Sequence, residues 1–161
     1  MDTIFREIVD ILETEVKESR GIRSVYYGDP GLIPKSSLPA ITVRPETSML
    51  SALGVGTGGT DRVEHMISIG LIYDMRAEFN KKPEQVKIVK SIMETIFERD
   101  SSGNLSSDTI VGAMRKYITL NSEILFANDF NVEYGVNDTR EFPTLEALIT
   151  FKAVLQPARP T

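Results

Sequence analysis

The chain has 161 residues, of which 41% are hydrophobic and 25% are charged, and its net charge is −5 at pH 7. These values are typical of one globular domain and exclude a fibrous or wholly disordered chain. The acidic balance argues against a protein that holds nucleic acid by neutralising phosphates, so we expect no sequence-specific nucleic-acid binding.

The residue types that are rare or missing exclude several kinds of functional site. The sequence has no cysteine and one histidine, which excludes disulfides, thiolate catalysis, cysteine-ligated zinc and histidine-rich metal sites. No apolar run approaches the roughly 18 residues that a membrane helix needs, and the first residues lack the pattern of a signal peptide. We therefore expect no membrane segment and no export by that route, and a reducing compartment fits the lack of cysteine.

The first 31 residues predict a helix and a strand. Apolar residues recur at helical spacing from Thr3 to Ser19, which predicts an amphipathic helix that Gly21 can end. A short strand is predicted over 22–27. The cluster Gly28–Gly31 stops it, because glycine and proline favour a turn there.

Two prolines bracket the next predicted strand. Ala40–Arg44 lies between Pro39 and Pro45, and since proline cannot donate to a sheet ladder, we predict a short strand, with an edge position as one option. Residues 46–60 show no period and include glycines at positions 54, 56, 58 and 59. We predict that they form the most flexible segment of the chain.

The clearest strand pattern runs from Arg62 to Asp74. Apolar and polar residues alternate there with a period of two, so one face of this strand is predicted to be the wall of the core. The residues on that face are Val63, His65, Ile67, Ile69, Leu71 and Tyr73.

Helical spacing returns in the second half of the chain. Pro83–Arg99 predicts a long helix, because proline suits the first turn and apolar residues recur at three and four. A shorter helix follows, with Ser106 or Ser107 as its cap. Gly112 in its middle weakens that prediction, since glycine costs about 1 kcal/mol relative to alanine in a helix.

Two strands close the chain and complete the fold class. Apolar residues occupy even positions over 124–134 and odd positions over 145–155, which predicts a final hairpin. Leu148 and Val154 lie on the opposite face of the last strand, so we expect a helix or a neighbouring subunit to cover part of it. The prediction is an α+β single domain over residues 1–161, with a mixed or antiparallel sheet of about five strands and helices mainly on one face.

The predicted core takes the members of each apolar face that lie nearest the middle of their elements. They are Ile8, Leu12, Val43, Ile67, Ile69, Leu71, Val89, Met93, Phe97, Phe130, Val132, Ile149 and Phe151.

The string Gly54–Gly59 satisfies the G-x-G-x-x-G pattern of dinucleotide-binding proteins. In such proteins the glycines leave a strand and open a helix, whereas here they follow a proline-bounded loop and enter a strand. No lysine and Ser/Thr pair follows them, which also excludes a Walker-type phosphate loop. We therefore expect no cofactor at this loop.

The polar residues that could carry chemistry are more simply interpreted as structure. His65 is predicted to be a hydrogen-bonded residue at the margin of the core, although spacing alone leaves a Ser-His-Asp triad open. Asp129, Asn131 and Glu133 are interpreted as a solvent face, with paired carboxylates of an enzyme or a weak calcium site as the alternative. We expect no enzyme and no catalytic, cofactor-binding or metal-binding residue. The one basic cluster, interpreted as a solvated helix face or a contact with an acidic partner, is Lys81, Lys82, Lys87 and Lys90.

Several features together carry a resemblance to a known family. They are the acidic helix Thr3–Ser19, the segment Gly21–Tyr27, the strand within Leu38–Pro45, the long loop before a long strand, the helix Pro83–Arg99 and the closing strand Leu145–Leu155. In plan and size, over nearly its entire length, the chain resembles the tail terminator (tail completion) proteins of bacteriophages with long, non-contractile tails.

The resemblance implies a structural function. Members of that family are small α+β proteins without cofactors that assemble as hexameric rings. They bind the head-proximal end of the tail tube, stop its polymerisation and provide the surface to which the neck of the filled head attaches. For this chain it implies a tail tube protein and head-neck completion proteins as partners, and a place in the virion tail after assembly in the host cytoplasm.

The long loop is the expected contact with the tail tube. We expect the loop from Met49 to Asp61 to be mobile in the free subunit and ordered on the tube. Two other classes stay open: a head-completion or neck adaptor protein, which also relies on ring contacts, and a small-molecule-binding regulatory α+β domain, which needs a formed pocket. The residues expected to contact the tube are Met49, Leu50, Leu53, Val55, Thr57 and Arg62.

Overall fold

A computed structural model of the chain describes residues 2–52, 59–75, 82–121, 123–124 and 126–157. These residues form one five-stranded sheet in the order β1-β2-β3-β5-β4. β1 and β2 are parallel, and the other neighbours are antiparallel. The strands are β1 (Ser24–Tyr27), β2 (Ala40–Ala52), β3 (Asp61–Asp74), β4 (Phe126–Asn137) and β5 (Thr144–Leu155).

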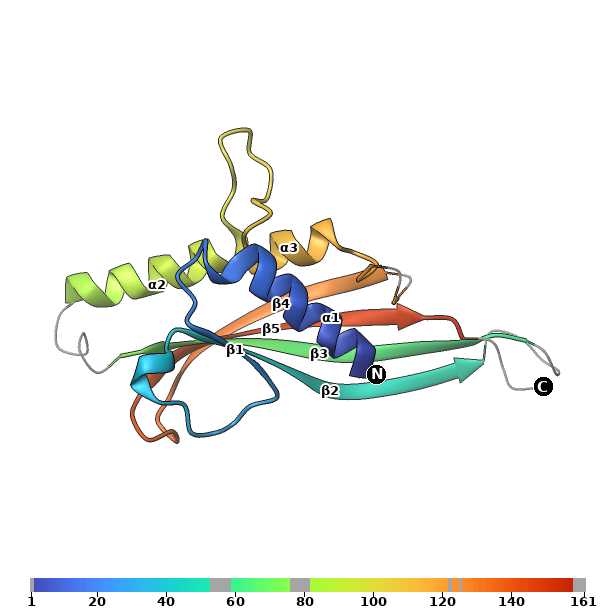
Figure 1. Cartoon of the computed structure of the whole chain (residues 1–161), viewed down its shortest axis with the longest axis horizontal. Coiled ribbons are helices and arrows are strands. Elements are labelled where there is room, and N and C mark those ends of the chain that lie inside the picture. The colour runs from blue at the N-terminus through green and yellow to red at the C-terminus, as the bar shows by residue number, and fades with distance from the viewer. Residues whose placement is uncertain (1, 53–58, 76–81, 122, 125, 158–161) are drawn as a thin grey trace.

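The helices lie on one face of this sheet (Figure 1). α1 (Asp2–Leu12) continues into a π-helical turn, η1 (Glu13–Lys17), and a 3-10 turn, η2 (Lys35–Ser37), precedes β2. α2 (Lys82–Phe97) and α3 (Ile110–Lys116) separate the first three strands from the last two. The mixed sheet and its one helical layer confirm the predicted α+β class. Within the described residues, none of the helices is both long and apolar enough to span a bilayer.

The core lies between the helices and the odd-numbered face of β3, as the alternation predicts. Ile67, Ile69 and Leu71 are fully buried there, together with Phe151 of β5. Apolar side chains of α1 pack on the same cluster because their helical spacing forms one stripe. Of the other predicted core residues, Ile8, Leu12, Val43 and Ile149 are buried, and Phe97, Phe130 and Val132 are partly buried against the cluster.

α2 corrects the predicted core at two positions. Val89 and Met93 are 45% and 44% exposed, while Ile88, Ile92 and Ile96 are buried. The apolar residues of this helix cover an arc wider than its contact with the sheet. The helical period alone therefore fits two overlapping apolar stripes and does not show which of them is buried. The isoleucine stripe faces the core, and Val89 and Met93 lie on one flank.

An ionic cluster fixes the end of α2 to its neighbours. Arg20, which follows η1, donates hydrogen bonds to Glu98 and, over 2.7 Å, to Asp108. Burial alone would raise the pKa of Asp108, but hydrogen bonds from Ser106, Ser19 and Arg20 outweigh it and lower the pKa to about 2. The charged carboxylate is thus strongly favoured, and through Arg20 it links the segment after η1, the end of α2 and the residues before α3.

α3 begins two or three residues later than the sequence predicts. Its cap is Thr109, whose side chain accepts a hydrogen bond from the Gly112 N–H over 3.0 Å. A Cβ at Gly112 would lie 1.8 Å from the Ser106 carbonyl oxygen and 2.5 Å from Thr109 Oγ1. Glycine is therefore required by close packing of the backbone, in spite of its poor helix propensity.

Replacing Gly112 with alanine is expected to destabilise the protein by about 1–3 kcal/mol, because overpacking against backbone outweighs the gain of about 1 kcal/mol in helix propensity. Urea denaturation measures the difference. Gly135→Ala is the matched control, since a Cβ there has nothing within 4 Å. A Gly112→Ala protein as stable as the wild type would show that the turn before α3 can move aside.

β4 departs from the strict alternation that the sequence predicts. Its register against β5 shifts between Asn128 and Asn131, and Asp129 has a φ of 57°. Because this bulge adds residues to one strand, Ala127 faces the core and is buried, although it is at an odd position. Asp129, Asn131 and Glu133 are exposed, as predicted for a solvent face.

The second face of the sheet is covered partly by loops. A small apolar cluster joins Ile33 and Leu38 to Ile72 of β3 and Phe142 of the β4–β5 connection. Arg140 holds the same region together through Asp29 at 2.9 Å and Glu146 at 3.0 Å. The sequence predicted that a helix or a neighbouring subunit covers part of this face. Loops cover part of it instead, because they carry apolar residues of their own.

Candidate functional site

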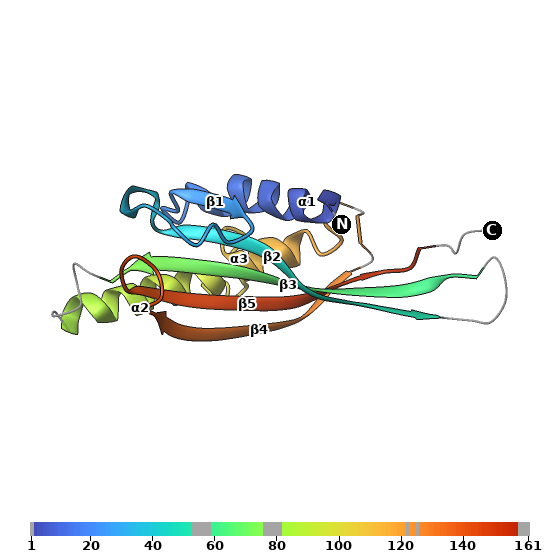
Figure 2. The ribbon, with the colours of Figure 1, turned by 90° about the horizontal axis from the view of Figure 1, so that it is seen from below.

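The most distinctive feature of the surface is a β-ribbon that extends beyond the helix-covered part of the sheet (Figure 2). It consists of residues 47–52 of β2 and 61–66 of β3, which pair from Thr47↔Met66 to Ala52↔Asp61. We call these residues the arm. The end of β5 accompanies it, with Leu155 paired to Val63, whereas β1 reaches only to Val43 of β2.

The arm corrects two sequence predictions. β2 does not end at Arg44 but continues to Ala52, so the irregular segment is shorter than the predicted 46–60. Pro45 is tolerated because β1 has already ended and a bulge follows between Pro45 and Thr47. From Pro45 to Ala52 every residue of β2 is exposed, and a strand exposed on both faces has no apolar period to detect.

Three of the six residues expected to contact a partner lie on the arm. Met49 and Leu50 are 64% and 68% exposed, and because they are consecutive in a strand they point to opposite faces. Arg62 is half-buried and pairs with Glu64, with 2.8 Å between Nη2 and Oε1. The other three lie outside the described residues: Leu53, Val55 and Thr57.

The glycine motif lies in the connection between the two strands of the arm. Most of Gly54–Gly59 is outside the described residues, but the elements on either side are antiparallel strands. A dinucleotide site of the Rossmann type needs a strand before the glycines and a helix after them. The structural context therefore does not fit that motif.

His65 joins the two strands near the base of the arm. Its Nδ1 lies 2.7 Å from Ser48 Oγ in the opposite strand, and the ring is half-buried, as predicted for the margin of the core. Burial lowers the pKa of His65. Within the described part of the chain, the structure contains no cluster of His, Asp and Glu side chains that could hold a metal ion.

A second apolar surface lies at the opposite edge of the sheet, on β4 and α2. Tyr134 and Val136 of β4 are 49% and 59% exposed. Helical geometry assigns Val89 and Met93 to the same surface, because the other flank of α2 lines grooves shared with Arg23, just before β1, and with residues 19–21, after η1. We call these four residues the β4 edge patch. Val89 and Met93 were in the predicted core, and Tyr134 lies on the predicted apolar face of its strand, because the periods do not show where a covering layer stops.

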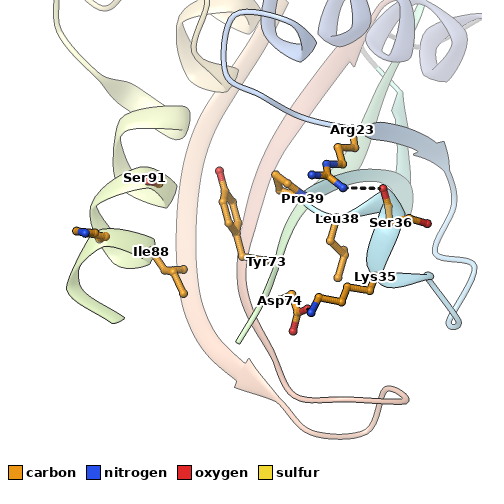
Figure 3. Close-up of a pocket in the computed structure, with 10 residues that line it drawn as sticks. Arg23, Lys35, Ser36, Leu38, Pro39, Tyr73, Asp74, Ile88 and Ser91 are labelled. Atoms are coloured by element: carbon orange, nitrogen blue, oxygen red, sulfur yellow. Dashed lines mark hydrogen bonds and ion pairs between the residues drawn. The ribbon is translucent and has the colours of Figure 1, made fainter. Parts of the chain in front are cut away.

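A groove of about 740 Å³ lies at the end of β3 opposite the arm (Figure 3). Its apolar part is formed by Leu38, Tyr73 and Ile88. Arg23 and Lys35 approach it from the side of β1 and η2, and Ser91 of α2 lies across from them (Figure 3). The groove joins segments that are distant in the sequence.

The chain matches no known family model, and no curated protein is significantly similar to it in sequence. Function therefore has to be inferred from the arm, the β4 edge patch and the groove.

Proposed function

We propose that this chain is a tail terminator protein of a bacteriophage with a long, non-contractile tail. In this proposal, six copies form a ring at the head-proximal end of the tail tube in the virion. The ring stops polymerisation of the tube and offers a docking surface to the head-neck completion proteins. The protein acts through the geometry of its interfaces, without a reaction or a cofactor.

The observation that carries this proposal is the arm. Folded monomers bury most large apolar side chains, yet Met49 and Leu50 stand on a ribbon that lies outside the core. The outer edge of β2 beyond Val43 has no strand beside it in the described sheet, so its backbone groups are also available. A projecting ribbon with apolar side chains on both faces suits insertion into, or pairing with, the end of a tube made of repeated subunits.

The two edges of the sheet support the ring. Apolar side chains are exposed at the β4 edge patch and, on the opposite edge, at Tyr27 of β1 and at the arm. When two different surfaces of the same chain meet, the contact is head to tail and can close into a ring. In the described sheet, the outer sides of β1 and β4 have no neighbouring strand. Their backbone groups can therefore form hydrogen bonds with neighbouring copies.

A neck adaptor is the nearest alternative, because it also relies on ring contacts. It differs in its partner: a terminator binds tail tubes in the absence of heads. A small-molecule-binding regulatory domain is favoured by one specific observation, the groove beside Tyr73 and Arg23. That class needs neither a ring nor a tube.

Tail tubes assembled from the tube protein of the same phage test the proposal directly. With the wild-type chain present, we expect tubes of defined length with a ring at one end, seen by electron microscopy. Val136→Lys should reduce the fraction of tubes that carry a ring at least ten-fold, because the new charge must be desolvated in the subunit contact.

Thr14→Lys is the matched control. It adds the same charge at an exposed position of η1, in the helical layer and outside the β4 edge patch, and ring formation should be unchanged. Tubes that keep growing and carry no ring with the wild-type chain would contradict the terminator function. Rings of normal abundance with Val136→Lys would place the subunit contact elsewhere.

A further inference from the structure

We propose that the groove between α2 and η2 binds a small organic anion with an apolar body, and that Arg23 holds its carboxylate. This site goes beyond the proposed ring function and does not depend on it.

Arg23 is the residue that indicates an anionic ligand. In the described part of the chain it makes one hydrogen bond, from Nη1 to the Ser36 carbonyl oxygen over 3.2 Å, and no ion pair. A guanidinium has five N–H donors in a planar fork that matches a carboxylate. Arg20 and Arg140, by contrast, each bind two carboxylates. Arg23 therefore retains donors at the mouth of the groove.

The remaining charges of the groove leave it with a positive balance. Lys35 Nζ lies 3.9 Å from Asp74 Oδ2, a long contact in which the lysine is 63% exposed and the carboxylate 13%. Among the described residues of the lining, Asp74 is the one acidic side chain, and Arg23 and Lys35 are the cations beside it. An anionic ligand therefore fits the site better than a neutral or cationic one.

The inner part of the groove selects for an apolar ligand body. Leu38 is buried within the small cluster on the second face, and Ile88 of α2 is buried as well. Tyr73 stands between them (Figure 3), and its burial raises the pKa of the phenol, which stays neutral. A volume of about 740 Å³ is within the usual range of small-molecule sites, about 300–1,000 Å³.

Fluorescence titration with 8-anilinonaphthalene-1-sulfonate tests this site, because the probe is both apolar and anionic. Arg23→Gln should raise its Kd about ten-fold, the expected effect of losing charge-assisted hydrogen bonds. Ser91→Phe should have a similar effect by filling the groove from α2. Decanoate should displace the probe, whereas decanol, which has no charge, should displace it at least ten-fold more weakly.

Lys90→Gln is the control on the same helix, since Lys90 is exposed and its ion pair is with Glu94 at 3.6 Å. Circular dichroism and urea denaturation confirm that each variant is folded. Arg23 is exposed, so its variant keeps the test valid if Ser91→Phe does not fold.

Three results would overturn the proposal. The first is unchanged probe binding in Arg23→Gln. The second is equal displacement by decanoate and decanol. The third is loss of the probe signal in a Met49→Ser, Leu50→Ser double variant instead, which would place the probe on the arm. None of these results bears on whether rings form on tail tubes, so the two proposals can fail separately.

Discussion

Replacing Phe151 with alanine is expected to lower the free energy of unfolding by about 3–5 kcal/mol. Phe151 is fully buried on β5, directly opposite Ile67 of β3 in the ladder. Its ring also stacks on Phe130, with 5.1 Å between centroids and 17° between planes. The variant loses both the transfer free energy of the ring and the contacts of a close-packed site, because neighbours on two strands cannot collapse into the space.

Urea denaturation of Phe151→Ala and Ile69→Ala measures this loss, and Ile69→Ala should cost about 2–5 kcal/mol. Val136→Ala is the matched control on the neighbouring β4, because a side chain that is 59% exposed contributes little. Its effect should stay within about 0.5 kcal/mol. Losses below about 0.5 kcal/mol in both core variants would mean that the two faces of the sheet have been exchanged.

The sequence predicts those parts of the fold in which apolar residues keep to one face and the other face carries mostly polar or small residues. α1, the body of β3 and β5 meet this condition, and their apolar periods identify the correct faces. α2 has a wider apolar arc, so its existence is predictable but its rotation is not. Choosing between Ile88 and Val89 requires knowing where the sheet lies beneath the helix.

Other features fall outside the reach of a periodic pattern. The β2 strand of the arm is exposed on both faces, which removes the period, and Pro45, just before the arm, argues for the end of a strand. The bulge at Asp129 moves Ala127 onto the core face without any signal in the apolar spacing. The groove depends on residues from β1, η2, β3 and α2, whose proximity only the folded chain establishes.

The candidate site was predictable in part. The segment around Met49 and Leu50 stands out in the sequence, because apolar residues occur in a region without a core period. The structure shows that these two side chains lie on the arm. Their surroundings, including the Ser48–His65 hydrogen bond at the base of the arm, follow from a register that the sequence does not specify.

Replacing Met49 and Leu50 together with serine is expected to abolish control of tube length while leaving the subunit folded. The two side chains are mostly exposed in the free subunit, so the free energy of unfolding should change by less than about 1 kcal/mol. On the tube they would become buried, and each buried Leu or Met contributes about 1.5–3 kcal/mol. Their combined loss should weaken binding to the tube end by at least about 100-fold.

Tube lengths in electron micrographs and sedimentation of the chain with preformed tubes measure this effect. Leu32→Ser is the control, since Leu32 is 73% exposed in the loop after β1, away from the arm. A second variant joins Thr47 to Met66 through Asn-Gly, because these two residues are direct partners in the ladder and Asn-Gly favours a two-residue hairpin turn. It removes the arm beyond its base and should give tubes of uncontrolled length.

Amide exchange separates a direct contact from an indirect effect. Strand pairing between Thr47–Ala52 and Asp61–Met66 protects alternate amides in the free subunit, while the outer edge of β2 should exchange quickly. Binding to a tube should protect that outer edge and slow exchange near Met49 and Leu50. If the double serine variant still controls tube length, or if the edge exchanges equally with and without tubes, the arm is a structural extension and the tube contact lies on another surface.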